Sequence, residues 1–184
     1  SPRRRWSPTV LRRTPSSLTK AREDLREEVE AHMFYQFLFF RQWLALKSYC
    51  NENGIRVIGD LPIFVAPDSA DVWTNPEEFQ LDENGTPIVV AGVPPDYFST
   101  TGQLWGNPLY NWDRMFAEGF KWWIERVRAT FTVVDFARID HFRGFAACWE
   151  IPGGDTTAER GQWVAAPGRE LFTAIRKALG ELPI

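Results

Sequence analysis

The order of helical and strand-like stretches limits the fold of this chain more than any other feature of its sequence. Apolar residues recur at helical spacing over residues 19–51, 113–130 and 167–180. Runs typical of strands lie at 55–63 and 133–139, and "ELPI" from residue 181 resembles the start of another. Such alternation is typical of a parallel sheet, either open or closed into a barrel. The sequence therefore predicts an α/β fold whose functional groups lie in the loops after the strands.

Local signals indicate where two of these elements end. The helix over 19–51, which has room for one break, is expected to stop at Asn53-Gly54, because glycine adopts the left-handed conformation at no steric cost. The run "IRVIGDLPI" follows, and its Gly, Asp and Pro place Asp60 at the C-terminal end of a strand. From Phe64 to Trp112 the chain is rich in Pro, Gly, Asp and aromatic residues. We expect a long loop there, of the kind that usually carries function.

Composition and charge narrow the classes of partner. The formal net charge is −3, so no overall positive field would attract nucleic acid or a membrane surface. No apolar span is long enough for a membrane helix, and two cysteines without a signal-like leader favour a reducing cytoplasm. Residues 1–17, with the basic stretch Arg3–Arg5, are expected to be a solvated connecting segment; a nucleic-acid arm or part of a transit peptide are the alternatives.

Metal chemistry finds little support in the residues present. The chain has two histidines and no CxxC pair, which argues against a zinc site. Aspartates at 68, 71, 82 and 96 offer oxygen ligands, but their spacing matches no EF-hand loop and aspartates commonly make turns. We therefore predict that no metal is bound.

The stretch "VVDFARIDHFRGF" carries the most specific chemistry. Along an extended strand alternate residues share a face, so Arg138 and Asp140 are expected to be neighbours. An arginine that close lowers the pKa of a carboxyl group, which suits a nucleophile better than a general acid. Retaining glycosyl transfer uses such a nucleophile, with a second carboxyl group as proton donor. A structural ion pair at a strand end is the alternative interpretation.

A second motif, "GVPPDYFSTTGQLWGNPLYNW", favours a carbohydrate ligand. Its aromatic residues are spread among Gly, Pro and polar residues, so we expect them to form a wall for sugar rings instead of a core: Tyr97, Phe98, Trp105, Tyr110 and Trp112. Packing beneath a long loop is the alternative for any one of them. Glu150 in "CWEIP" is expected at a loop start as an ordinary solvated side chain, and is not our candidate for the proton donor.

Four motifs together resemble a known family. "GDLPIFVAPDSADVW", "GVPPDYFSTTGQLWGNPLYNW", "RIDHFRGF" and "CWEIP", in this order and spacing, are similar to the 4-α-glucanotransferases (amylomaltase, or disproportionating enzyme) of glycoside hydrolase family seventy-seven, relatives of the α-amylases. The resemblance implies that 18–184 is a partial catalytic domain, the middle portion of a (β/α)8 TIM barrel with a long aromatic-rich active-site loop. It also implies transfer of α-1,4-glucan segments between maltooligosaccharides by retaining double displacement, with no cofactor.

The resemblance assigns roles to residues at matching positions. Asp140 would be the catalytic nucleophile, with Arg138 as its ionising partner. His141 would bind the sugar, and Asp60 would contact substrate hydroxyls.

On the acceptor side the resemblance concerns the aromatic loop. Asp96, Tyr97 and Phe98 would meet the acceptor from a flexible segment over residues 94–102, and Trp105 would stack on a glucose ring. In the family the acid/base glutamate follows in an "AEDLG"-like strand end, which would begin just past "ELPI". The 184-residue chain would then be a slice that is inactive by itself.

Two other functions stay open at this point. An α-glucan hydrolase of the amylase clan would share the nucleophile, whereas a non-catalytic glucan-binding module would need the aromatic wall but not Asp140. In each case the partners are α-1,4-glucans and maltooligosaccharides, with no nucleic acid and no membrane. The expected compartment is the cytoplasm, or a plastid if the source is a plant or an alga.

Overall fold

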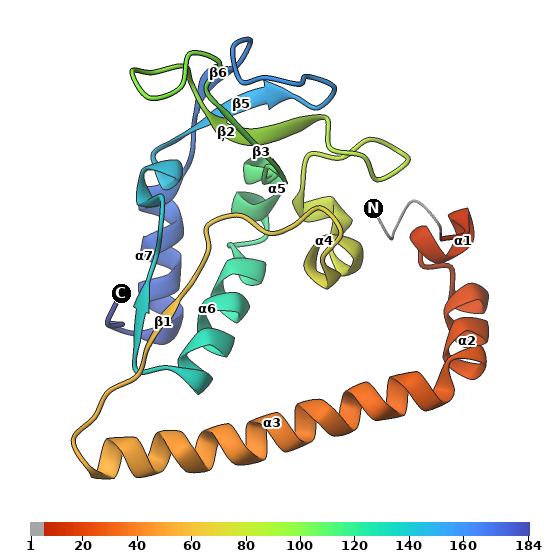
Figure 1. Cartoon of the computed structure of the whole chain (residues 1–184), viewed down its shortest axis with the longest axis vertical. Helices are drawn as coiled ribbons and strands as arrows, with labels where there is room; N and C mark the ends of the chain where they lie inside the picture. The colour runs from red at the N-terminus through yellow and green to blue at the C-terminus, as the bar shows by residue number, and fades with distance from the viewer. Residues whose placement is uncertain (1–5) are drawn as a thin grey trace. The chain divides into compact units, whose positions relative to one another are not determined.

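The computed structural model describes residues 6–184 and divides the chain into two compact units. Residues 1–57 with 133–135 form the first unit, and residues 58–132 with 136–184 form the second. The arginines at 3–5 lie outside the described residues. Figure 1 identifies the helices and strands of both units.

The first unit is helical and confirms the predicted long helix with one break. Its helices are α1 (Pro8–Leu11), α2 (Pro15–Asp24) and α3 (Arg26–Glu52), the long orange helix of Figure 1. The break falls at Leu25, which lies outside the helical ranges of both α2 and α3. Asn53 ends α3, and Gly54 follows with a φ of 76°, as expected from the stop signal. Because α2 begins at Pro15, part of the expected connecting segment is helical, and its role stays a prediction.

Asp135 is the best-connected carboxylate of the first unit. It accepts hydrogen bonds from the Val57 N–H at 2.8 Å and from Asn51 Nδ2 at 2.8 Å, and its other oxygen lies 2.9 Å from Lys47 Nζ. These three donors, Val57 first, hold the pKa of Asp135 well below its usual range. The carboxylate therefore joins the end of α3 to the residue that precedes β1 (Ile58–Asp60).

This network makes a pH-dependent contribution to stability. An aspartate whose pKa is lowered on folding stabilises the protein above its unfolded value of about 3.9, and the contribution is lost as pH falls below that value. We expect Asp135→Asn to lower the urea midpoint at pH 6, and the difference from the wild type to shrink steadily toward pH 2. Paired urea titrations across that range measure it. A constant difference at every pH would show that charge on Asp135 is not what stabilises this unit.

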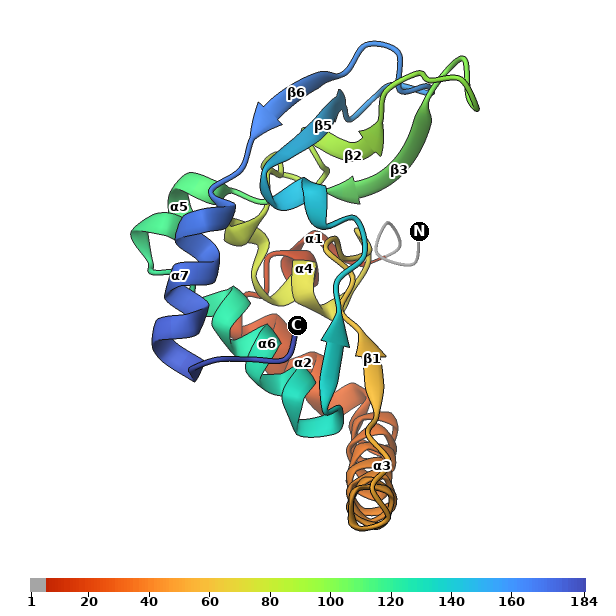
Figure 2. The same ribbon diagram turned by 90° about the vertical axis from the view of Figure 1, so that its left-hand side faces the viewer.

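The second unit contains the predicted parallel strand pair. β1 (Ile58–Asp60) pairs in parallel with β4 (Phe136–Arg138), and the register sets Asp60 opposite Arg138. Burial alternates along β4 and beyond, with Ala137 buried and Phe136, Arg138 and Asp140 exposed, as the strand period requires. The helices of this part of the chain are α4 (Ala70–Thr74), α5 (Trp112–Ala117), α6 (Lys121–Val133) and α7 (Gly168–Leu179), with 3-10 turns η2 (Pro76–Glu78) and η3 (Phe142–Phe145). Figure 2 shows β1 and β4 side by side.

A four-stranded antiparallel sheet is the main feature that sequence analysis missed. Its order is β3-β2-β5-β6, with β2 (Val89–Val93), β3 (Gln103–Pro108), β5 (Ala147–Pro152) and β6 (Gln162–Ala165). The expectation of one loop from Phe64 to Trp112 is therefore wrong, since that segment contains α4, η2, β2 and β3. Its strands are short, and the β2–β3 pairing shifts register between Val90 and Gly92, which hides their alternation in the sequence.

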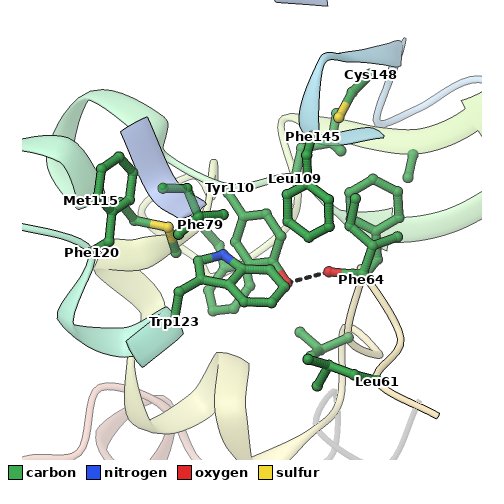
Figure 3. Close-up of a cluster of buried hydrophobic side chains, with 14 of the residues drawn as sticks. Leu61, Phe64, Phe79, Leu109, Tyr110, Met115, Phe120, Trp123, Phe145 and Cys148 are labelled. Carbon is green, nitrogen blue, oxygen red and sulfur yellow. Dashed lines mark hydrogen bonds between the residues drawn. The ribbon is translucent and has the colours of Figure 1, made fainter. Parts of the chain in front are cut away.

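Aromatic side chains fill the core of the second unit (Figure 3). Tyr110 is 1% exposed and donates its hydroxyl hydrogen to the Ile63 carbonyl at 2.5 Å, so it is a core residue and not part of an exposed wall. Trp112 also packs against this core. A phenol with a buried carbonyl partner can enter the interior without losing a hydrogen bond, which explains why the expectation fails for Tyr110.

Two further predictions have mixed outcomes. The helix expected over 113–130 is interrupted at Gly119 and Phe120, both at positive φ; Met115 and Trp123 are buried as expected, whereas Phe116 is 58% exposed. "ELPI" is not a strand, although the Pro183 carbonyl accepts a hydrogen bond from the Ala137 N–H at 3.1 Å. Among residues 6–184 there is no helix with the length and apolar character needed to cross a bilayer.

Candidate active site

Asp60 and Arg138 form an ion pair at the carboxyl ends of β1 and β4. Arg138 Nε lies 2.8 Å from Asp60 Oδ1, and Arg138 Nη2 lies 3.0 Å from Asp60 Oδ2. This two-point contact follows from the parallel register, which sets the two residues opposite each other. The hydrogen bonds and charge of Asp60 raise the pKa of Arg138. Our expectation that Arg138 pairs with Asp140 is thus corrected: its direct partner is Asp60.

Asp140 lies two residues past the end of β4, where the chain has begun to turn. Its Oδ1 accepts the backbone N–H of His141 at 2.9 Å, and the side chain is exposed. Its charge makes a smaller contribution than Asp60 to the raised pKa of Arg138. Asp140 is therefore within electrostatic range of the guanidinium while its second oxygen has no hydrogen bond among the described residues. A carboxylate in this setting can attack an electrophilic carbon.

His141 adopts a left-handed backbone, with φ 50° and ψ 42°. Positive φ is uncommon outside glycine, and such positions concentrate at functional sites. Burial lowers the pKa of His141 and the charge of Arg143 adds to this effect, while Asp140 opposes it. The imidazole is consequently neutral near pH 7 and can both donate and accept a hydrogen bond.

Trp105, on β3, stands edge-on to His141. Their ring centroids are 4.8 Å apart with an interplanar angle of 84°, and the indole is 38% exposed. The Trp105 Nε1 donates to Gln103 Oε1 at 3.1 Å, which helps to fix the ring. Phe64 is 8% exposed and lies close to both rings. The centroid of its ring is 6.4 Å from that of Trp105 and 6.3 Å from that of His141. Sequence analysis missed Phe64, although its apolar position directly after "DLPI" was a usable signal.

The aromatic loop is held by its own hydrogen bonds. Asp96 Oδ1 accepts the N–H groups of Phe98 and Ser99, both at 2.8 Å, so this carboxylate shapes the turn. Tyr97 and Phe98 are 96% and 91% exposed, and their rings pack edge-to-face on each other at 5.6 Å. The structure brings Asp60, Arg138, Asp140, His141 and Trp105 together, and shows no contact between them and these three loop residues.

Glu150 differs from its expected setting. It lies within β5, is half-buried, and accepts a hydrogen bond from Gln80 Nε2 at 3.2 Å. Burial raises its pKa, and the Gln80 contact opposes the rise. The prediction of a solvated loop residue is wrong, because Ile151-Pro152 continues the strand instead of ending it before Glu150. Among residues 6–184 no cluster of three His, Cys, Asp or Glu side chains is arranged to hold a metal ion.

Comparison with known proteins identifies the family of this chain. The family model described as 4-alpha-glucanotransferase, of glycoside hydrolase family seventy-seven, matches residues 1–184. This chain belongs to the 4-α-glucanotransferase family. A 4-alpha-glucanotransferase from Thermus thermophilus is 55% identical over 183 residues, which is 100% of this chain and 37% of that protein. One from Synechocystis is 54% identical over 97% of this chain and 36% of its own length.

Solved structures give the same result for the fold. Amylomaltase from Streptococcus agalactiae in complex with acarbose superposes with a TM-score of 0.95 at 48% identity, over 98% of this chain and 37% of that one. Amylomaltase from Corynebacterium glutamicum, at 23% identity and a TM-score of 0.67, shares the fold. The chain thus spans somewhat more than a third of the length of the 4-α-glucanotransferases that it matches.

The exposed face of Trp105 makes a direct test of sugar stacking. In the complete enzyme we expect Trp105→Ala to weaken maltooligosaccharide binding by about 2- to 10-fold, which corresponds to a stacking energy of about 0.5–1.5 kcal/mol. Calorimetric titration measures the affinity, and the melting temperature should barely change because the ring is partly exposed. Gln103→Ala is the matched control, because it removes the Nε1 partner and keeps the ring. Unchanged affinity with a large loss of stability would make Trp105 a packing residue.

Proposed function

We propose that this chain provides the nucleophile and part of the sugar-binding wall of a 4-α-glucanotransferase. The observation that carries the proposal is the convergence of Asp140, Arg138 and His141 beside Trp105, at the carboxyl ends of a parallel strand pair. Catalytic groups at that end of parallel strands are the rule in α/β enzymes. The family to which the chain belongs supports the same activity.

In the proposed reaction a carboxylate oxygen of Asp140 attacks the anomeric carbon of an α-1,4-glucan. The glycosidic C–O bond breaks as the new C–O bond forms, and a second carboxyl group gives its proton to the leaving oxygen. The hydroxyl of a maltooligosaccharide acceptor then attacks the glycosyl-enzyme. Its proton goes to the second carboxyl group, and Asp140 is released as a carboxylate. No cofactor takes part in these steps.

The other site residues have distinct parts in this proposal. Arg138 places a positive charge near the Asp140 carboxylate, while its direct contact is with Asp60. Asp60 orients the guanidinium through its two-point contact and offers its oxygens to substrate hydroxyls. Neutral His141 hydrogen-bonds a sugar hydroxyl, and Trp105 stacks on a glucose ring. Asp96, Tyr97 and Phe98 form the acceptor-side loop.

The second carboxyl group is not assigned to Glu150. Retaining transfer requires two carboxyl groups roughly 5–5.5 Å apart. Glu150 is held by Gln80 on the antiparallel sheet, whose contacts differ from those around Asp140. The proposal therefore applies to a full-length enzyme. The matching relatives are much longer than this chain, which covers 37% and 36% of two of them.

We also propose that β1 and β4 are strands of a (β/α)8 barrel. Ile58 is 70% exposed and Phe136 is 43% exposed, on the face that carries Asp60 and Arg138. Apolar strand residues directly below catalytic groups are typical of a barrel interior, which layers of such side chains fill. Residues 18–184 would then belong to the catalytic domain, and residues 1–17 to a segment that connects to it.

The relatives support α-1,4-glucans and maltooligosaccharides as substrates. The Streptococcus agalactiae amylomaltase binds acarbose, which makes a related ligand reasonable for this chain. A cytoplasmic site is proposed for a bacterial source. Relatives from potato and Arabidopsis are named chloroplastic/amyloplastic, which favours a plastid for a plant source.

The test is to incubate the complete enzyme with maltotriose and separate the products by chromatography. A glucanotransferase produces glucose together with maltopentaose and longer chains, whereas a hydrolase produces glucose and maltose without elongation. A glucan-binding module binds maltotriose and leaves it intact. Absence of products longer than maltotriose would overturn the proposed activity.

A further inference from the structure

The segment between β5 and β6, residues 153–161, lies against the base of the aromatic loop. Its first residue, Gly153, donates its N–H to the Ile88 carbonyl at 2.8 Å. Further along, Ala158 is fully buried and packs with Val90 and Ile151 of the antiparallel sheet. Ala158 is therefore the buried point of the segment, whereas residues 153, 154, 156, 159 and 160 are exposed.

Both backbone groups of Ala158 are used in this contact. Its N–H donates to the Thr101 carbonyl at 2.9 Å, and its carbonyl accepts the indole N–H of Trp149 at 2.9 Å. Thr101 belongs to the 94–102 loop and Trp149 belongs to β5. Ala158 thus connects the loop to a strand of the sheet through two hydrogen bonds.

The loop base leaves no space beside Ala158. Gly102 has a φ of 71°, and a Cβ added to it would lie 2.7 Å from the Ala158 Cβ and 2.4 Å from the Val93 carbonyl oxygen. A side chain at position 102 would therefore collide with Ala158 and with the loop backbone, and Ala158 is fully buried, so added atoms at position 158 must also displace a neighbour. Interiors respond to one extra methyl group, since they are packed as densely as organic crystals.

Hydrogen bonds within the loop connect Gly102 to the residues that carry the two aromatic rings. Ser99 Oγ donates to the Gly102 carbonyl at 2.7 Å, and Asp96 holds the amides of Phe98 and Ser99. Tyr97 and Phe98 are almost fully exposed, so core packing does not fix their positions. The hydrogen bonds of Asp96 and Ser99 therefore fix the backbone from which these rings extend.

We infer that residues 153–161 are a positioning element for the aromatic loop, with Ala158 at its centre. The inference rests on the proposed function for its consequence: the element sets where Tyr97 and Phe98 meet the acceptor, and so governs acceptor selectivity. It does not act on Asp140, so bond cleavage in the donor does not depend on it. The ion pair between Arg160 and Asp155 closes the segment from its exposed side.

The test variant is Ala158→Val in the complete enzyme, which adds two methyl groups at the contact with Gly102. We expect the KM for a maltooligosaccharide acceptor to rise by about tenfold or more, since small displacements can cost up to ~10²-fold. The pre-steady-state rate at which the glycosyl-enzyme forms from the donor should change by less than about threefold, because Asp140 is not displaced. Hydrogen exchange of the amides of residues 97–99 should accelerate.

A double-variant comparison separates positioning from general damage. In a Tyr97→Ala/Phe98→Ala background, Ala158→Val should have no further effect on the acceptor KM, because the rings that it displaces are gone. An equal penalty in that background would overturn the inference, as would an unchanged acceptor KM together with unchanged amide exchange in Ala158→Val. Glu159→Ala is the control within the segment. It removes a hydrogen bond that Thr157 donates to the Glu159 carboxylate, and this bond lies inside the segment and does not involve the loop.

A substitute variant and a second measurement apply if Ala158→Val does not fold or if transfer is absent. If Ala158→Val does not fold, Arg160→Ala opens the segment at an exposed ion pair and is judged by the same criteria. If the wild-type enzyme performs no transfer at all, the proposed function fails. The exchange rates of residues 97–99 in the variants then still decide whether residues 153–161 hold the loop.

Discussion

Asp140→Asn in the complete enzyme is expected to reduce disproportionation of maltotriose by at least ~10³-fold, because an amide cannot form the covalent glycosyl intermediate. The exposed Asp140 carboxylate accepts a hydrogen bond from a backbone amide, and an asparagine carbonyl can accept the same bond. The fold and the affinity for maltooligosaccharides should therefore survive the substitution. Initial rates of glucose release, together with calorimetric titration, separate the two effects.

A matched control uses the same chemical change at another aspartate. Asp82 Oδ1 accepts the N–H groups of Asn84 and Thr86 in a turn, and Asp82→Asn preserves that acceptor. Its transfer rate should equal that of the wild type. Near-normal glucose release by Asp140→Asn would remove Asp140 from the nucleophile role and return the strand end to a structural ion pair.

Trp123→Ala is expected to destabilise the protein by about 3–5 kcal/mol, the range for removing a large aromatic side chain from a core. Trp123 is 1% exposed and its ring lies within 5.4 Å of those of Tyr110, Trp122 and Phe145. Its Nε1 is buried without a hydrogen-bond partner among the described residues, so the loss would come from packing. Urea unfolding followed by circular dichroism measures the change.

Trp163 is the matched control for this prediction. It is 41% exposed on β6, with the Arg143 guanidinium 4.2 Å from its ring centroid. Trp163→Ala should cost clearly less stability than Trp123→Ala. Similar losses for both variants would mean that the aromatic cluster of Figure 3 does not carry the stability of the second unit.

Features that depend on local sequence were predictable. The end of α3 at Asn53-Gly54 and the place of Asp60 at a strand end each follow from signals within a few residues, whereas the single break was expected without a position. The parallel pairing of β1 with β4 followed from the alternation of helices and strands. Asp140 was proposed as the nucleophile because it follows an apolar strand and lies near arginine residues, and that role stays a prediction.

Features that depend on distant residues were not predictable. Arg138 pairs with Asp60, which is 78 positions away, and only the strand register reveals that contact. Tyr110 enters the core because the Ile63 carbonyl, 47 positions away, accepts its hydroxyl hydrogen. The antiparallel sheet joins β2 to β5 across a similar separation, so composition alone suggested a loop.

The left-handed backbone of His141 restricts which residues can follow Asp140. β-branched side chains are disfavoured at positive φ, whereas Gly, Asn and Asp tolerate it. Position 141 therefore combines a backbone turn that begins η3 with a neutral ring that we propose binds the sugar. His141→Asn keeps the turn and removes the ring, whereas His141→Val removes the ring and also disfavours the turn. A comparison of these two replacements separates what the peptide contributes to the geometry around Asp140 from what the imidazole contributes to binding.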